Sequence, residues 1–117
     1  MKSRASQRAL AFAVAASAVA MLVMAGGAVA VAAKPVTHRV TIEGTAFSPP
    51  ALTINRGDSV VWVNKDPYPH TATSKAGGFD SREIQPGKSW KHTAKTAGEF
   101  AYICTIHPSM KGTLRVK

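Results

Sequence analysis

The sequence predicts an all-β domain, built as a two-sheet sandwich or a closed barrel. Beyond residue 35, apolar residues recur with a period of two, which is the spacing of side chains on one face of a strand. Glycine, proline, asparagine and aspartate interrupt these runs at short intervals, as turns do between strands. Seven or eight short strands in one small domain fit either architecture.

The first expected strand runs from Val36 to Glu43. Its apolar face carries alternate residues, namely Val36, His38, Val40 and Ile42. Such alternation is typical of a half-buried strand. Residues 47–50 are expected to be a loop, because two prolines cannot take part in a central ladder. The strand pattern then resumes at residues 52–54.

Ser59 to Asn64 is expected to be the central strand. Its middle is a nearly continuous run of β-branched and aromatic residues, which is typical of a strand covered on both faces. A loop with two prolines follows at residues 65–69. His70 begins the next extended segment and therefore lies at the edge of a strand.

The last third of the chain predicts three more strands, at residues 90–94, 100–104 and 113–117. A strong turn signal, Gln85-Pro86-Gly87-Lys88, precedes the first of them. The penultimate strand ends at Cys104, the only cysteine of the chain.

Residues 1–33 predict a secretory signal peptide. Three basic residues, the last of them Arg8, precede an alanine-rich stretch from Ala9 to Ala25, and small residues follow. Cleavage is expected within residues 30–34, so the protein is expected to be exported. The alternative is an uncleaved membrane anchor, because this segment is long enough to cross a hydrocarbon core of about 30 Å.

Cleavage after Ala33 leaves residues 34–117, which suffice for one domain with a modest core. This part holds 12 Lys and Arg against 6 Asp and Glu, a net charge of +6 that favours acidic partners. Nucleic acid is not an expected partner, since the chain has no basic helix and no interleaved aromatic platform. We expect a monomer that contacts a membrane only if the signal segment stays uncleaved.

A solitary cysteine in an exported chain needs an explanation, because exported domains normally use cysteines in disulfide pairs. His107 and Met110 follow Cys104 on what must be a tight loop, and His70 lies upstream. Thiolate, two imidazoles and thioether form the ligand set of a mononuclear blue-copper centre. On the cysteine count alone, an intermolecular disulfide or an inert buried thiol would be as well supported as metal ligation.

Zinc is the competing metal for these residues. A structural zinc site usually has four strong ligands and seldom uses methionine, whereas this chain offers three strong candidates. His38 and His92 lie apart from them on other expected strands and are expected to be structural, so no second metal centre is predicted.

The sequence carries three motifs together: Gly57-Asp58-x-Val60-x-Trp62-x-Asn64, Pro69-His70-Thr71 and Gly98-x-Phe100-x-Tyr102-x-Cys104-x-x-His107-Pro108-x-Met110-x-Gly112. They resemble the cupredoxins, the blue copper proteins, over essentially all of residues 34–117. The two-residue gap between His107 and Met110 is similar to that of amicyanin rather than plastocyanin. The resemblance implies a Greek-key β-sandwich with one type 1 copper ion, which transfers single electrons in the periplasm and is not an enzyme.

The resemblance also implies roles for single residues. The copper ligands would be His70, Cys104, His107 and, along the axis, Met110. Asn64 would tie the two ligand-bearing loops together, and the backbone N–H of Thr71 would bond the cysteine sulfur. Ile106 stands where relatives often have proline, so its free N–H is expected to give the sulfur a second bond.

The function expected from these observations is one-electron transfer between redox partner proteins by Cu(II)/Cu(I) cycling. An apolar patch around His107 would be the docking face, and the positive charge would steer a partner with an acidic surface. The alternative is a copper-binding carrier that delivers the metal without transferring electrons, since it would use the same residues.

Overall fold

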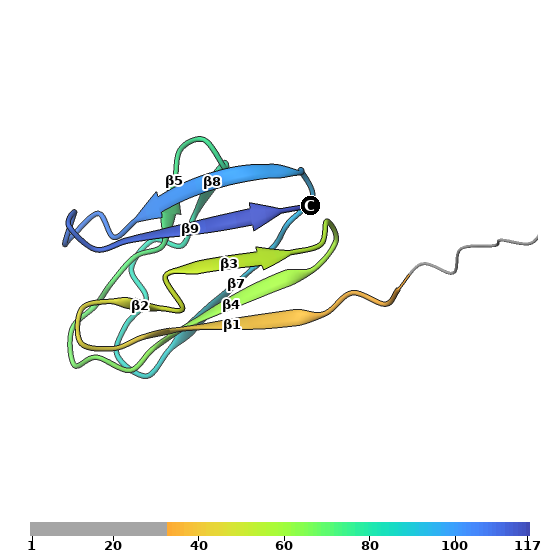
Figure 1. The fold of residues 1–117 in the computed structure, drawn as a ribbon. Coiled ribbons are helices and arrows are strands. Elements are labelled where there is room, and N and C mark those ends of the chain that lie inside the picture. The colour runs from red at the N-terminus through yellow and green to blue at the C-terminus, as the bar shows by residue number, and fades with distance from the viewer. Residues whose placement is uncertain (1–32) are drawn as a thin grey trace, which may run out of the picture. The chain divides into compact units, whose positions relative to one another are not determined.

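The computed structural model describes residues 33–117, and this part of the chain is all β. One sheet has the order β2-β1-β4-β7 and consists of β1 (Thr37–Ile42), β2 (Phe47–Ser48), β4 (Ser59–Asn64) and β7 (Ser89–Thr93). The other has the order β3-β9-β8-β5-β6 and consists of β3 (Ala51–Ile54), β5 (Thr73–Ser74), β6 (Phe79–Asp80), β8 (Gly98–Ile103) and β9 (Lys111–Val116). Figure 1 shows β8 and β9 lying over β1 and β4. The predicted all-β sandwich is confirmed.

Strand β4 is central in its sheet, as predicted. It pairs in parallel with β1, from Thr37 opposite Ser59 to Ile42 opposite Asn64, and antiparallel with β7 on its other side. The expectation that both its faces are covered is wrong. Val61 and Val63 point away from the core and are only half-buried, because within residues 33–117 no layer packs on the outer face of this sheet.

Phe47 and Ser48 form a short strand rather than the expected loop. Phe47 pairs with Ile42 and its side chain is almost fully buried. β2 lies at the edge of its sheet, and the two prolines follow it instead of lying within it. An edge position next to a proline pair is compatible with the ladder, so the loop begins two residues later than the sequence predicted.

Aromatic side chains fill the space between the sheets. The Trp62 ring lies 5.4 Å from the Tyr102 ring, edge to face, and 5.6 Å from the Trp90 ring, measured between centroids. Gly112 lies opposite Tyr102 in the ladder, and a Cβ there would collide with the tyrosine ring. Trp62 and Tyr102 are part of the buried core, and their packing requires glycine at this position of β9.

Two ends of the sandwich differ in their loops. β4 ends, β8 ends and β9 begins at the left of Figure 1, so loops 65–72 and 104–110 meet there; we call this the His70 end. Turns 55–58 and 94–97 meet at the opposite end, where the Gly57 N–H donates to the Ala94 carbonyl at 2.7 Å. We call this the Asp58 end.

The predicted signal peptide lies outside the described residues, apart from Ala33. Within residues 33–117 the structure has no helix of the length and hydropathy that a membrane span requires.

Candidate metal centre

Three of the predicted ligands meet at the His70 end. The ligand atoms of His70, Cys104 and His107 all lie within 4.8 Å of one another. The Cys104 Sγ is 3.7 Å from the His70 Nδ1 and 3.8 Å from the His107 Nδ1. His70 and Cys104 are fully buried, whereas His107 is half-buried and reaches the surface.

These separations fit a single metal ion. Metal–sulfur and metal–nitrogen bonds of about 2.3 and 2.0 Å, set about 120° apart, put the sulfur and nitrogen atoms about 3.7 Å from each other. The donor set of one thiolate and two imidazoles also suits copper, since sulfur is a soft ligand and imidazole an intermediate one. The residues present therefore fit a trigonal copper site.

Met110 is buried in the loop that also carries Cys104 and His107. Its side chain is 3% exposed and belongs to the core. Its backbone closes the loop: the Met110 N–H donates to the His107 carbonyl at 2.8 Å, and the Cys104 N–H donates to the Met110 carbonyl at 3.1 Å. The loop thus holds all three of its predicted ligands in a compact turn.

His70 is held by a backbone pairing with Ile84. The His70 N–H donates to the Ile84 carbonyl at 3.2 Å, and the Ile84 N–H donates back at 2.7 Å. Asn64 supports the same loop, because its side-chain amide donates to the carbonyls of Tyr68 at 2.7 Å and Ile84 at 2.8 Å. The expectation that Asn64 ties the two ligand loops together is not met, because among the described residues its side chain bonds only on the His70 side.

Thr71 makes that tie instead. Its N–H donates to the Cys104 Sγ at 3.3 Å, as expected, and its Oγ1 accepts the Thr105 N–H at 2.9 Å. The side-chain role escaped the sequence analysis, because a threonine hydroxyl next to a ligand has no distinctive spacing signal. The first bond polarises the sulfur and the second fixes the loop that carries it.

The expected second bond to the sulfur is absent among the described residues. The Cys104 Sγ accepts one backbone N–H, that of Thr71, and Ile106 donates no bond to it. The turn is closed instead by the bonds between His107, Met110 and Cys104. The expected bond from Ile106 to the sulfur is therefore not found.

Asp66 is a hydrogen-bond partner of His70 that the sequence analysis missed. Its Oδ2 lies 2.8 Å from the His70 Nε2. Because an ionised carboxylate can only accept, Nε2 must carry the hydrogen, so in the neutral ring the Nδ1 lone pair faces Cys104. The available signal was a carboxylate four residues before a candidate ligand, which alone is too common to be specific.

Asp66 is ionised despite its burial. Burial raises the pKa of this carboxyl, whereas the backbone N–H groups of Thr45 and Gly44 and the His70 ring lower it. The net result is a pKa below the ordinary value. A negative charge therefore stands directly behind one predicted ligand.

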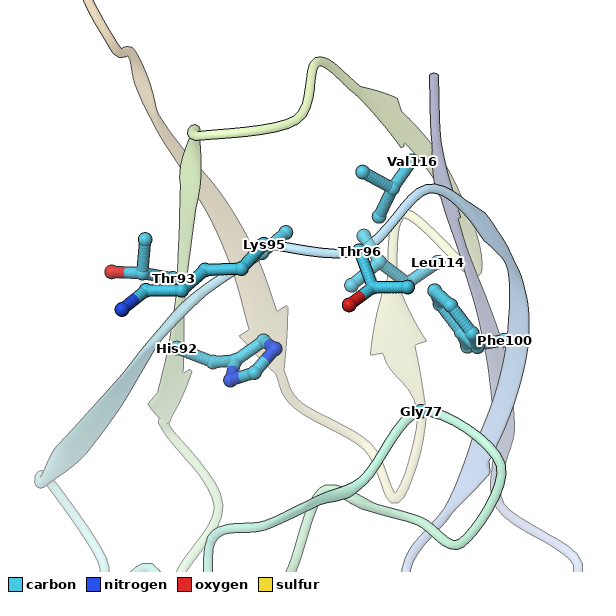
Figure 2. A pocket seen from close by; sticks show the side chains of 9 residues that line it. Gly77, His92, Thr93, Lys95, Thr96, Phe100, Leu114 and Val116 are labelled. Carbon is cyan, nitrogen blue, oxygen red and sulfur yellow. The ribbon is translucent and has the colours of Figure 1, made fainter.

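The other two histidines do not join this cluster. At the Asp58 end, His38 Nε2 lies 2.9 Å from the Asp58 Oδ2. His92 points into a cavity of about 180 Å³ beside Phe100, Leu114 and Val116 (Figure 2), and burial lowers its pKa. Within the described part of the chain, the one cluster with metal-ligand geometry is therefore at the His70 end.

Comparison with known proteins gives consistent similarities. A family model described as a cupredoxin-like domain matches residues 12–116. The chain is 33% identical over 118 residues to amicyanin-alpha of Methylorubrum extorquens, covering 94% of this chain and 99% of that protein. It is 32% identical over 83 residues to amicyanin of Paracoccus versutus, covering 67% of this chain but only 63% of that protein.

Solved structures show the same likeness. The structure of the Cu(I) form of an amicyanin variant, with one methionine replaced by alanine, superimposes with a TM-score of 0.64 at 27% identity. The match covers 74% of this chain and 86% of that one.

Proposed function

The chain belongs to the cupredoxin-like family, and from this we propose that it is an exported type 1 copper protein that carries single electrons between redox partners. The observation that carries the proposal is the close approach of one sulfur and two nitrogen ligand atoms in a buried site. A bound copper ion would supply the one-electron couple, and no substrate would be transformed.

The proposed copper ligands are His70, Cys104, His107 and Met110. The first three have the separations of a trigonal site. Met110 is buried in the same loop, where a weak axial thioether is typical of blue-copper centres. The family likeness and the donor chemistry both favour copper over zinc.

Electron transfer benefits from ligands that stay in place in both oxidation states. Thr71 fixes Cys104 to the opposite loop, and Asp66 fixes His70 from behind. Neither bond needs the metal, so the site is organised before copper enters. This rigidity supports electron transfer over a copper-delivery role, in which the ligands would have to open.

The proposed docking face surrounds His107. Ile106, next to it, is 43% exposed, and Tyr68, on the His70 loop, is 60% exposed. Large apolar side chains left in water beside a redox centre favour a small, transient contact with a protein partner. Electrons would then pass through the exposed edge of His107.

Long-range attraction would come from the lysines near this face. Lys65 and Lys111 adjoin the loops of the His70 end, whereas Lys95 lies at the Asp58 end, away from the proposed docking face. A partner with an acidic surface would therefore be attracted mainly by Lys65 and Lys111. Raising the ionic strength should slow the association.

Export of the protein is part of the proposal. It is supported by the basic, apolar and small-residue order of the first 33 residues. Amicyanin relatives add support through their similarity to this chain. Detection of the processed chain in the periplasm of the native cells would test it.

One experiment tests the function on the full chain loaded with Cu(II). Voltammetry should show a reversible one-electron wave, and the reduced protein should keep Cu(I) when a competing chelator is added. Rapid loss of Cu(I) to the chelator, with no reversible wave, would overturn electron transfer and indicate a copper carrier.

A further inference from the structure

The Asp66 carboxylate receives three hydrogen bonds in a nearly closed environment. Its Oδ1 accepts the Gly44 N–H at 2.7 Å, and its Oδ2 accepts the Thr45 N–H at 2.8 Å and the His70 Nε2–H at 2.8 Å. Asp66 is 7% exposed and His70 is fully buried. A charged group withdrawn from water in this way needs such donors, and here two of the three come from the turn after β1.

One residue of that turn, Thr45, has a backbone conformation that its side chain does not favour. Gly44 has a φ of 63° and Thr45 a φ of 56°, both in the left-handed region. Glycine adopts this region freely, but a β-branched threonine does so only when its surroundings enforce it. The consequence of the conformation is that two successive N–H groups point toward one carboxylate.

From this arrangement we infer that the turn Gly44-Thr45 and Asp66 act together as a positioning unit for His70. The turn holds the carboxylate, and the carboxylate fixes the tautomer and orientation of the ring, with Nδ1 toward the Cys104 sulfur. The unit would thereby set the preference of the site for Cu(II) over Cu(I). This last step rests on the proposed function, whereas the tether itself does not require a metal.

The direction of the effect follows from the charge. A carboxylate that accepts the far N–H of a ligating imidazole makes that ligand more basic. Its negative charge also favours the more positive metal ion. Both effects stabilise Cu(II) relative to Cu(I), so removing the charge should raise the reduction potential.

The chain contains its own control for this argument. Asp58 is 4% exposed and accepts the Val36 N–H at 2.9 Å, the Asn55 N–H at 3.1 Å and the His38 Nε2–H at 2.9 Å. This bonding closely matches that of Asp66, but it lies at the Asp58 end. Asp58→Asn therefore measures what losing such a carboxylate does to the fold without touching the predicted copper ligands.

The tether can be tested without copper, by NMR of the imidazole nitrogens in the metal-free full chain. We expect His70 in the Nε2–H form, with a proton that exchanges slowly with water. Thr45→Pro removes one donor to Asp66 and the left-handed φ, and it should speed that exchange while leaving His38 unchanged. An Nδ1–H form in the unmodified protein, or an unchanged His70 exchange rate in the variant, would overturn the inference.

The effect on the metal is tested by the reduction potentials of copper-loaded Asp66→Asn and Asp58→Asn. Loss of an outer partner typically changes metal affinity about tenfold or more. If the ratio of the affinities for Cu(II) and Cu(I) falls tenfold, the reduction potential rises by about 59 mV for a one-electron couple. We expect this rise, or loss of copper from a folded protein, in Asp66→Asn alone. Equal shifts in both variants, or none in Asp66→Asn, would overturn the tuning role.

The two tests separate this inference from the proposed function. If the unmodified protein takes up no copper, the proposed function fails, while the metal-free NMR experiment still decides whether the turn and Asp66 hold His70.

Discussion

Strand β4 carries nearly the same bonding arrangement just beyond each of its ends. Asp58 precedes the strand and bonds His38, whereas Asp66 follows it and bonds His70, at 2.9 and 2.8 Å. Each aspartate is buried and also accepts two backbone N–H groups. The two bonded histidines nevertheless differ in exposure. The His38 side chain is 26% exposed, whereas His70 is fully buried.

What separates the two ends is the loop that each histidine meets. At the His70 end the turn after β8 delivers Cys104 and His107 against the ring. At the Asp58 end the facing turns contribute backbone bonds, such as that between Gly57 and Ala94. A buried aspartate–histidine pair is thus a way to anchor a loop. It adjoins a candidate metal centre only where a second loop brings a thiolate.

The largest difference is expected when each histidine is removed in turn. His70→Ala should weaken Cu(II) binding by more than about 100-fold, because losing even an outer partner can cost that much. His38→Ala should leave copper affinity unchanged and should lower the free energy of unfolding by about 1 kcal/mol for the lost hydrogen bond. Competition titration with a copper chelator measures the first effect, and urea unfolding the second. Equal copper affinity in the two variants would refute the distinction between the ends.

Two glycine substitutions should show different costs for packing near the His70 end and for turn geometry at the Asp58 end. Gly112→Ala should lower the free energy of unfolding by about 3 kcal/mol, because the new methyl group collides with the buried Tyr102 ring. Gly57→Ala should cost about 1 kcal/mol, because its φ of 98° is strained for alanine although the space is open. Chemical denaturation of both variants would check the order, and a larger loss at Gly57 would contradict this description of the core.

Acid should reveal the charge at the Asp58 end. The hydrogen bond from His38, together with the N–H groups of Val36 and Asn55, holds the pKa of Asp58 below its ordinary value of 3.8. A carboxyl whose pKa is lowered in the folded state stabilises the fold fully at pH values above the pKa that the same carboxyl has in the unfolded chain. That contribution is lost as the pH falls through the folded pKa.

We therefore expect the free energy of unfolding to decrease as the pH is lowered beneath about 4. This decrease should be less steep in Asp58→Asn. Urea midpoints of the two proteins in acid and at neutral pH give the comparison. Parallel pH profiles would show that the Asp58 charge does not contribute.

The smallest effect is expected at the strained turn of the His70 end. Thr45→Gly keeps the N–H that bonds Asp66 but removes the steric cost of the left-handed φ. It should raise the free energy of unfolding by at most about 1 kcal/mol. Since the hydrogen bond is kept, the reduction potential of the copper-loaded protein should not change. Thermal unfolding and voltammetry check the two statements, and a changed potential would mean that the threonine side chain itself acts on the site.

The strands and the ligand set could be predicted because both rest on local patterns. Alternation over residues 36–43 and 59–64 sets which side chains face the core, and the close spacing of Cys104, His107 and Met110 requires one tight loop. The structure confirms the sandwich and brings three of the four candidate ligands into one cluster.

The surroundings of the site could not be predicted, because they depend on contacts between loops. The partner of His70 is an aspartate held by a turn more than 20 residues upstream. Likewise, Thr71 rather than Asn64 joins the two ligand loops, and Ile106 gives no bond to sulfur. Each depends on backbone directions in loops, which residue spacing does not encode.

The central claim is that the His70 end, and no other part of residues 33–117, holds one copper ion through a thiolate. Titration of the purified full chain with Cu(II), followed by visible absorption, tests it most directly. We expect an intense thiolate-to-copper absorption band that saturates at one equivalent, bleaches reversibly with ascorbate and is absent from Cys104→Ser. A colourless adduct, or a band that persists in Cys104→Ser, would contradict it.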